Sequence, residues 1–331
     1  MNPTLVQSFS MNGPDVEAAT SLSVVVCAYT TERWSDLSAA VRSVLDQRQA
    51  VHELLVVIDH CDELFERASA QYGDNLSVRV LENAEARGLS GARNTGVRAA
   101  TGAVVAFLDD DAVAAPDWAE SLLVHYDDPD VMGVGGYVAP RWPKSRPNWM
   151  PPEFDWVVGC SYVGQPLAVA PVRNFIGCNM SLRRTVFADV GGFDDAVGRV
   201  ASKPAGCEET ELCIRVRSRH RSARLLHDPA VRVTHRVTEP RTTFRYFVRR
   251  CYHEGISKAV VTELAGSRDA LSSEREYTTR VLPRAVVTGL RSPSDGGLAR
   301  VGAVLAGLVV TIAGYSRGRT ARRLCRGAGY V

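Results

Sequence analysis

The sequence predicts an α/β fold built on a doubly wound, mainly parallel sheet, and three observations support this prediction. Continuous, mostly apolar runs of strand length lie at 22–28, 54–58 and 103–108, as in strands that are buried on both faces. Residues 36–47, between the first two runs, place their apolar side chains at helical spacing. Strands and helices then alternate, which is typical of parallel sheets with right-handed crossovers.

The predicted elements of the first half follow in a regular order. After the first strand and helix come a strand at 54–58, a helix at 64–72, a short strand at 77–81, a helix at 91–100 and a strand at 103–108. Parallel strands end at one edge of a sheet, where ligands of such folds bind. We therefore expect Ala28, Asp59 and the run Asp109–Asp111 to lie within reach of a single ligand.

The composition and periodicity of the sequence change at residue 139. Residues 139–173 are rich in proline, hold three tryptophans and show no clear periodicity. They predict either a functional lid or binding loop, or a packed insert whose tryptophans lie in the core. Residues 177–235 are α/β in character again, and residues 242–280 have a helical pattern.

Composition bounds the class of protein. The chain has 331 residues, 45% of them hydrophobic, enough for one large α/β domain with an appendage. The eight cysteines include no CxxC pair and follow no secretory signal, so we expect a reduced, cytoplasmic setting. Residues 1–20 are polar and aperiodic and predict a flexible leader. The net charge of +2 hides an arginine-rich tail that contains Arg300, Arg317, Arg319, Arg322, Arg323 and Arg326.

Three consecutive carboxylates follow the strand at 103–108. Asp109, Asp110 and Asp111 repel one another, and a divalent cation would relieve that repulsion. Hard oxygen ligands of this kind suit Mg2+ or Mn2+ bound together with a substrate diphosphate. The alternative is an Asp-rich surface turn before the helix that begins near 116–118. The neighbouring motifs favour the metal site.

A glycine-rich stretch, Arg87–Gly96, precedes the Asp triplet. Its small residues permit a close approach of the backbone to a ligand, and Ser90 is suited to cap the helix that follows. Arg93, one turn inside that helix, predicts a diphosphate site. The alternative is an ordinary turn with an exposed arginine.

Four motifs in this order resemble the family 2 glycosyltransferases of the GT-A fold, over roughly residues 22–236. They are Val24–Tyr29, Val56–Asp59, Arg87–Gly96 and Phe107–Asp111. The resemblance implies that Ala28, Tyr29 and Asp59 hold the nucleotide base and ribose of a donor, together with Asp109, Asp110 and Arg93 near its diphosphate. It also implies a ribose-facing acid at Glu32, which could equally be a solvated residue at the entry of a helix.

This chain departs from the family pattern at two points. Cys27-Ala28 stands where Pro-Thr or Pro-Ala is commoner, and Ile58-Asp59 stands where two Asp are usual. Asp59 still offers a carboxylate that can accept from a uracil N–H or a ribose hydroxyl. We therefore still expect nucleotide binding, while the choice of base is left open.

The second half resembles the acceptor half of the same family. The motifs are Gly177–Arg184, Val190–Asp194 and Gly206–Leu212. By this resemblance Glu209 is the catalytic base and Glu208 the fallback, and crowding with Glu211 should raise at least one of their pKa values. The alternative is that these acids only favour the dipole of the helix that they begin.

His235 ends an alternating strand at 230–235. By the same resemblance it reaches the metal or the diphosphate, with Asp111 as the principal metal ligand and Asp109 in support; the alternative is a structural histidine. The arginines at 215, 217, 219 and 221 predict a solvated basic face, and we expect no nucleic-acid partner.

The apolar run 301–315 lies between Arg300 and Arg317. Its 15 residues fall short of the ~20 that cross a bilayer upright. A helix lying in the inner leaflet, with its arginines on anionic headgroups, fits this pattern. The alternative is a helix packed on the catalytic domain or on a second subunit.

We therefore expect a metal-dependent glycosyltransferase that inverts the anomeric centre of the sugar it transfers. The expected donor is a nucleoside diphosphate sugar, with UDP favoured, and the expected acceptor is a glycan or a lipid-linked molecule. Such a reaction would serve cell-envelope polysaccharide or glycolipid synthesis. The GT-A domain spans 21–240, divided at 138/139, and 241–331 form a helical region in peripheral contact with the inner face of the membrane. Two rival functions are a nucleotidyltransferase, although Cys27–Thr30 lacks its basic glycine-rich loop, and a non-catalytic nucleotide-sugar binder.

Overall fold

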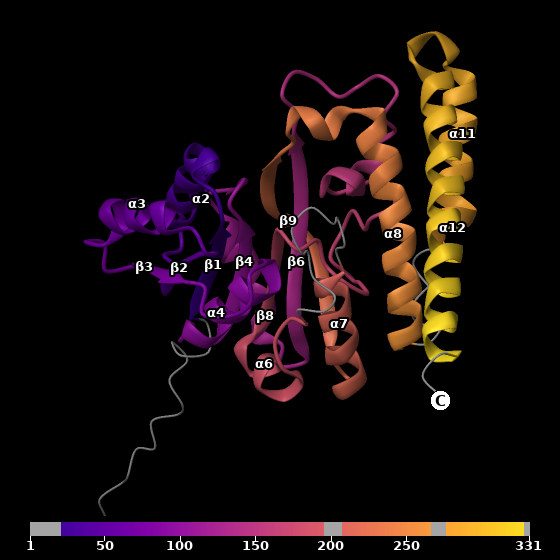
Figure 1. Cartoon of the computed structure of the whole chain (residues 1–331). Coiled ribbons are helices and arrows are strands. Elements are labelled where there is room, and N and C mark those ends of the chain that lie inside the picture. The colour runs from indigo at the N-terminus through magenta and orange to yellow at the C-terminus, as the bar shows by residue number, and fades with distance from the viewer. Residues whose placement is uncertain (1–20, 195–206, 266–275, 328–331) are drawn as a thin grey trace, which may run out of the picture.

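The computed structural model describes residues 21–194, 207–265 and 276–327, so the predicted leader at 1–20 lies outside the described residues. One sheet runs through these residues in the order β3-β2-β1-β4-β8-β6-β9-β5, and β7 pairs with β9 beside this path. Helices cover the sheet, and a helical group stands at one side of it (Figure 1). The predicted α/β class is confirmed.

The first half is parallel, as the sequence predicts. Strand β1 (Leu22–Ala28) pairs in parallel with β2 (Glu53–Ile58) and with β4 (Val104–Asp109), and β3 (Val78–Glu82) extends β2. The helices between them are α2 (Trp34–Leu45), α3 (Asp62–Tyr72) and α4 (Leu89–Ala99). The expected elements are present, with ends that differ by one or two residues.

The second half of the sheet is mixed, which the expected mainly parallel arrangement did not describe. Strand β8 (Asn179–Arg183) runs antiparallel to both β4 and β6 (Val131–Arg141), because it enters the sheet from the irregular excursion and not from a crossover helix. Strand β9 (Arg224–Arg236) is parallel to β6. The other elements here are β5 (Ala112–Ala114), α5 (Trp118–Leu123), β7 (Ala170–Pro171), α6 (Arg184–Val190) and α7 (Glu208–Arg219).

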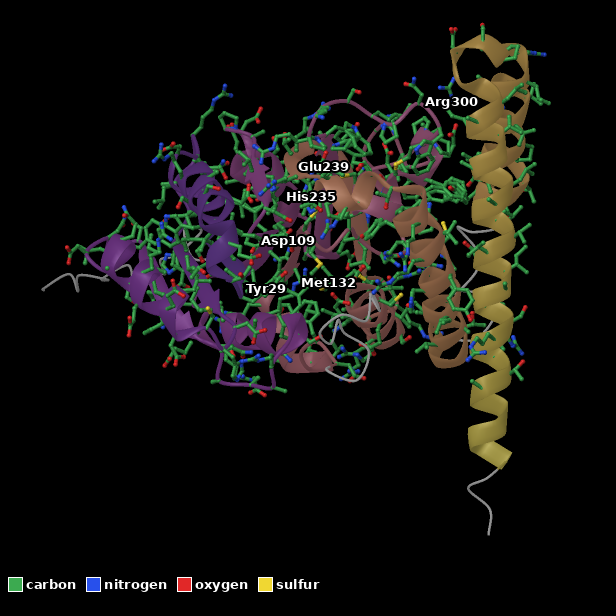
Figure 2. The ribbon with its side chains drawn as sticks, turned by 45° about the horizontal axis from the view of Figure 1, so that its top comes forward. Tyr29, Asp109, Met132, His235, Glu239 and Arg300 are labelled. Atoms are coloured by element: carbon green, nitrogen blue, oxygen red, sulfur yellow. The ribbon has the colours of Figure 1, made fainter. Side chains whose placement is uncertain are left out.

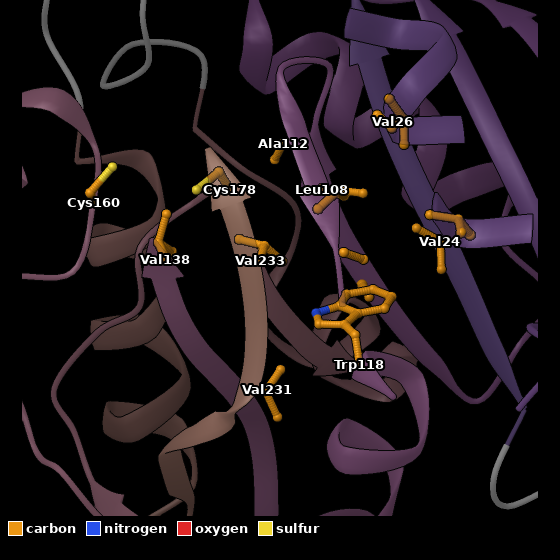
Figure 3. Packing of buried hydrophobic residues seen from close by; sticks show 14 of the residues in the cluster. Val24, Val26, Leu108, Ala112, Trp118, Val138, Cys160, Cys178, Val231 and Val233 are labelled. Carbon is orange, nitrogen blue, oxygen red and sulfur yellow. The ribbon is translucent and has the colours of Figure 1, made fainter. Parts of the chain in front are cut away.

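Two apolar clusters fill the faces of the sheet. Figure 3 shows part of the larger cluster, in which Val24, Val26 and Leu108 of β1 and β4 lie on the same side as Trp118. The smaller cluster covers the other face around Phe107, which packs edge-on to Phe193. Since the central strands are buried on both faces, their carboxyl ends are held rigidly at one edge.

The proline-rich excursion is packed against the body of the protein. Its 3-10 segment, Pro152–Val158, is mostly buried, and Trp149 packs edge-on to Phe244 and Phe247. This supports the expected packed insert, yet Trp156 and its neighbours also line a cleft that is described below. One face of this segment is therefore a packed insert, and another face lines a cleft, as a binding loop would.

Three long helices form the C-terminal group: α8 (Phe244–Ala265), α11 (Leu282–Arg291) and α12 (Gly297–Gly327), with a π-helical turn at Tyr277–Val281. Helices α8 and α12 run side by side (Figure 1). Glycines allow this approach: a Cβ on Gly255 would lie 2.1 Å from the carbonyl oxygen of Thr311, and one on Gly314 would lie 2.0 Å from that of Tyr252. Helix α12 is also much longer than the apolar run at 301–315, so the length argument against a full membrane crossing was wrong.

Candidate functional site

The strand ends meet as predicted. Ala28 pairs with Ile58 in register, so Asp59 follows beside it, and Cys27 pairs with Asp109. Figure 2 places Asp109 and His235 together in the middle of the molecule, between the two halves of the sheet. The polar ends of β1, β2, β4 and β9 thus converge on one edge.

Asp111 is held between the imidazole of His235 and the guanidinium of Arg33. Nε2 of His235 lies 3.1 Å from Oδ1 of Asp111, and Nη1 of Arg33 lies 3.3 Å from Oδ2. The pairing of β5 with β9 fixes this geometry, because Ala112 is opposite His235 and the amide of Arg236 donates to the carbonyl of Asp111. The proximity of His235 to Asp111 therefore follows from strand register.

The neighbouring carboxylates have opposite pKa shifts. Burial raises the pKa of Asp110 to about 7, and the adjacent charge of Asp111 adds to this effect. Burial also acts to raise the pKa of Asp111, but the hydrogen bond and charge of His235 and the charge of Arg33 lower it overall. Oδ2 of Asp110 is buried and has no hydrogen-bond partner among the described residues. A cation bound beside the triplet would compensate for this crowding of charge.

Three ligand-type groups come close enough to share a metal ion. The ligand atoms of Asp109, His235 and Cys178 all lie within 4.8 Å of one another. Carboxylate and imidazole suit Mn2+, and carboxylates suit Mg2+, so the residues present fit a divalent cation. Cys178 was missed by the sequence analysis, since a lone cysteine in an apolar stretch carries no signal of ligation.

Arg93 is buried at the centre of the site. Only 2% of its surface is exposed, so the alternative of an exposed arginine is wrong. Its guanidinium lies 3.4 Å from Asp109 and 3.3 Å from Glu208, and it donates to the carbonyl of Gly177 over 2.9 Å. Arg93 thus joins the metal-side carboxylates to the predicted catalytic pair.

The helix that carries Arg93 is not capped as predicted. Gly88 is its N-cap, with φ at 135°, a conformation that favours glycine. Ser90 lies inside the first turn, and its hydroxyl donates to the carbonyl of Asp194. The expectation that Ser90 caps this helix was wrong. The chain enters the helix through the positive φ of Gly88, and no side chain caps it.

Glu208 and Glu209 differ in their surroundings. The carboxylate of Glu208 accepts from Arg93 and from the amide of Cys207, at 3.3 and 3.0 Å. Glu209 is half-buried, and burial together with the charge of Glu208 raises its pKa to about 8. Glu211 is bound to Arg215 at 2.6 Å and does not contribute to this crowding. Once deprotonated, Glu209 is therefore a stronger base than an ordinary carboxylate, as a proton acceptor in the reaction requires.

The residues expected to bind the base and ribose of a nucleotide differ in their exposure and in their contacts. The carboxylate of Asp59 accepts from the side chain of Asn83 and the amide of Gly88, at 2.7 and 3.0 Å, so it also holds the turn before α4. Tyr29 is 55% exposed, and Arg33 lies over its ring at 5.4 Å. Glu32 is exposed, and among the described residues it is the next one, Arg33, that lines the central cleft. Nothing in the sequence distinguished Arg33 from its neighbour.

One cleft of about 940 Å³ joins the metal-type cluster, Arg93 and the paired acids, whereas the expected base and ribose residues Ala28, Tyr29, Glu32 and Asp59 are not part of its lining. Its lining includes Asp109, Asp111 and His235 at one end and Glu208 and Glu209 beside Arg93. It continues past the excursion to α8 and α12. Paired acids, a buried arginine and a metal-type cluster in one open cleft are suited to group transfer between two bound substrates.

Comparisons with known proteins agree with this arrangement. The family model "Glycosyl transferase family 2" matches residues 23–191. A glucosyl-dolichyl phosphate glucuronosyltransferase of Haloferax volcanii is 38% identical over 294 residues, covering 88% of this chain and 93% of the relative. The mannosyltransferase PcManGT of Pyrobaculum calidifontis, solved with GDP-Man and Mn2+, has a similar fold (TM-score 0.55, 19% identity, 90% of this chain and 86% of that one). So does GalNAc-T7 solved with UDP, GalNAc and Mn2+ (TM-score 0.54, 18% identity, 78% and 53%).

Proposed function

Because the chain belongs to glycosyl transferase family 2, we propose that it moves a sugar from a nucleoside diphosphate, preferably UDP, to a hydroxyl of a lipid-linked acceptor. Family membership favours sugar transfer over the two rivals, a nucleotidyltransferase and a non-catalytic binder. One observation carries the proposal: a single cleft is lined by the carboxylates of Asp109, Asp111 and Glu209. Similarity to the Haloferax volcanii protein suggests a glucuronosyl group as the sugar and a glucosylated lipid phosphate as the acceptor.

The donor half would hold the nucleotide diphosphate. Asp111 and Asp109, with His235, would bind a Mn2+ or Mg2+ ion, which would stabilise the charge of the departing diphosphate. Arg93 is positioned to bind a phosphate oxygen through the same guanidinium that now contacts Asp109. Ala28, Tyr29, Glu32 and Asp59 lie at or next to the strand ends where we propose that the base and ribose bind.

The acceptor hydroxyl would react in one displacement. Glu209 accepts its proton as the hydroxyl oxygen bonds to the anomeric carbon and the bond from that carbon to the diphosphate oxygen breaks. A single displacement inverts the anomeric centre. The ion pair of Glu208 with Arg93 supports Glu209 as the base, because it leaves Glu208 engaged on the donor side.

A donor screen tests the proposal directly. Thermal unfolding with Mn2+ present, across UDP-, GDP- and dTDP-sugars including UDP-glucuronic acid, should show stabilisation by one nucleotide class, since ligands that bind only the folded state raise its stability. The stabilising donor should then yield a new glycosidic product with a prenyl-phosphate glucoside. Stabilisation without any glycosidic product would contradict sugar transfer.

We propose that α12 contacts the inner face of the membrane. Residues Gly297–Ala321 of α12 are apolar and long enough to cross a bilayer by length and composition, and 28% of their most apolar 18-residue stretch is buried in the protein. A full crossing would carry the tightly packed α8, with Arg250 and Glu254, into the bilayer at high cost. Contact through the exposed apolar face fits better. That face comprises Leu298, Leu305, Val309 and Ile312, with Val287 and Leu290 of α11 beside it.

Liposome binding provides the corresponding prediction. The double variant Leu305→Gln and Val309→Gln should bind anionic vesicles more weakly than wild type, because two exposed apolar side chains are lost without disturbing the contact of α12 with α8. Salt should weaken but not abolish binding of the wild type. Leu76→Gln, a change of a fully exposed leucine far from α12 in the sequence, is the control. Equal sedimentation of all three proteins would contradict this membrane face.

We predict that replacing Arg33 changes the affinity for the metal and the affinity for the donor in opposite directions. Its guanidinium contacts both Asp110 and Asp111, so it competes with a cation for their charge. Arg33→Met should therefore raise the affinity for Mn2+ alone and lower the affinity for the donor, whose phosphates lose a cationic partner. Titration calorimetry with Mn2+ and then with UDP measures both, and a fall in both affinities would show that Arg33 only orders the triplet.

The pKa of Glu209 predicts the pH dependence of transfer. Since the base acts when deprotonated and its pKa is raised to about 8, the rate should rise with pH until pH passes this value. Glu208→Gln removes the adjacent charge that raises this pKa, so the midpoint should move to lower pH. Measuring kcat against pH for the wild type and for Glu208→Gln gives the shift of the midpoint. An unchanged midpoint would mean that a group other than Glu209 limits the rate at low pH.

A further inference from the structure

The central cleft continues beyond Glu209 to a charged face of α8. Arg250, Glu254 and Lys258 lie four residues apart, so they share this face, and all three line the cleft. Glu254 binds both cations, with its carboxylate 3.0 Å from Arg250 and 3.3 Å from Lys258. Two cations on one carboxylate leave a surplus positive charge inside a cleft.

Helix α12 adds mostly apolar lining to the same cleft. Leu308, Ile312 and Tyr315 line the same cleft. Ile312 is also exposed on the outer face, next to Leu305 and Val309, so apolar surface continues from the cleft to the outside of the helix. The glycine contacts between α8 and α12 hold the charged face and the apolar wall at a fixed separation.

We propose that α8 and α12 form the acceptor subsite for a lipid phosphate, in which Arg250 and Lys258 bind the phosphate and Leu308 and Ile312 contact the first part of the lipid chain. This inference rests on the proposed function and assigns the part of the cleft that the donor does not use. The sugar on the phosphate would then extend toward Glu209.

The chemistry of the cleft favours a phosphate on a lipid over a free sugar. A guanidinium has several N–H donors and binds phosphate oxygens strongly, and partial burial strengthens the attraction. Glu254 keeps both cations in place without cancelling their combined charge. An apolar wall beside a cationic patch matches an amphiphile whose charged group separates a sugar from a hydrocarbon chain.

Paired acceptors test this assignment. The probes are glucosyl geranyl phosphate and, without the phosphate, octyl glucoside. Lys258→Gln and Arg250→Gln should raise the KM for the phosphate-containing acceptor about tenfold or more while leaving the KM for octyl glucoside and the donor Kd near wild type. Arg245→Gln, an exposed residue of the same helix, is the control and should change neither KM.

A binding assay keeps the inference testable even if turnover is low. Geranyl phosphate should raise the melting temperature of the wild type more than inorganic phosphate or geraniol does, and Leu308→Asn should abolish the advantage of geranyl phosphate over inorganic phosphate. Equal effects of Lys258→Gln on both acceptors, or equal stabilisation by phosphate and geranyl phosphate, would overturn the subsite. Transfer to octyl glucoside alone would uphold the glycosyltransferase proposal while refuting this inference.

Discussion

Asp111→Asn is expected to abolish sugar transfer and to remove the metal dependence of donor binding. The substitution keeps the shape of the side chain but deletes the charge that would balance a divalent cation, between His235 and Arg33. The loss of metal affinity should exceed the roughly 10–100-fold seen when only an outer partner of a ligand is removed. Calorimetric titration with Mn2+ and a donor hydrolysis assay measure the two effects.

The control for this variant is Asp117→Asn. Asp117 precedes α5 and makes no capping hydrogen bond with its side chain, so its change should leave metal binding unaltered. Asp109→Asn should also weaken the metal, because Asp109 lies in the cluster with His235 and Cys178. Donor hydrolysis that Mn2+ still stimulates in Asp111→Asn would refute the assignment of this residue.

Glu209→Gln should reduce the rate of transfer by roughly 10²–10⁴, the usual contribution of a positioned general base. Donor affinity should stay near wild type, since Glu209 stands apart from the contacts that Arg93 makes with Asp109. Single-turnover transfer measured together with the Kd of UDP separates the two quantities.

The matched variant is Glu208→Gln. It should retain much more activity than Glu209→Gln, although it loosens Arg93 by removing the contact at 3.3 Å. If Glu208→Gln is inactive and Glu209→Gln is active, the two roles must be exchanged.

The sequence predicted the first half of the fold well because the physical signal there is local. Short apolar runs rich in β-branched residues, such as 54–58, are typical of central strands, and the helices between them have a clear period. The direction of β8 could not be predicted, since pairing direction depends on how the preceding excursion returns to the sheet. The apolar run at 301–315 marks only the middle of α12, which extends from Gly297 to Gly327 within the predicted helical region and packs against α8.

The site was predictable in part for a related reason. Asp109, Asp111 and Glu209 stand in runs of neighbouring acidic residues, which can be recognised in the sequence alone. Arg33, Cys178 and Arg250 are ordinary residues in the sequence, and they join the site only because strand register and helix packing bring them there. The capping role predicted for Ser90 failed because a backbone angle at Gly88, which no side-chain pattern reports, decides where that helix begins.

The unbroken sheet limits how this molecule can move. Hydrogen bonds link β3 through β2, β1, β4, β8 and β6 to β9, so the parallel half and the mixed half of the sheet share one rigid framework. A hinge between the halves would have to break the pairing of β4 with β8, at the cost of its ladder of backbone bonds. A closure around bound substrates would therefore move segments outside the sheet and not the two halves of the sheet against each other. A hydrogen-exchange experiment across the catalytic cycle should find β4 and β8 equally protected with and without donor.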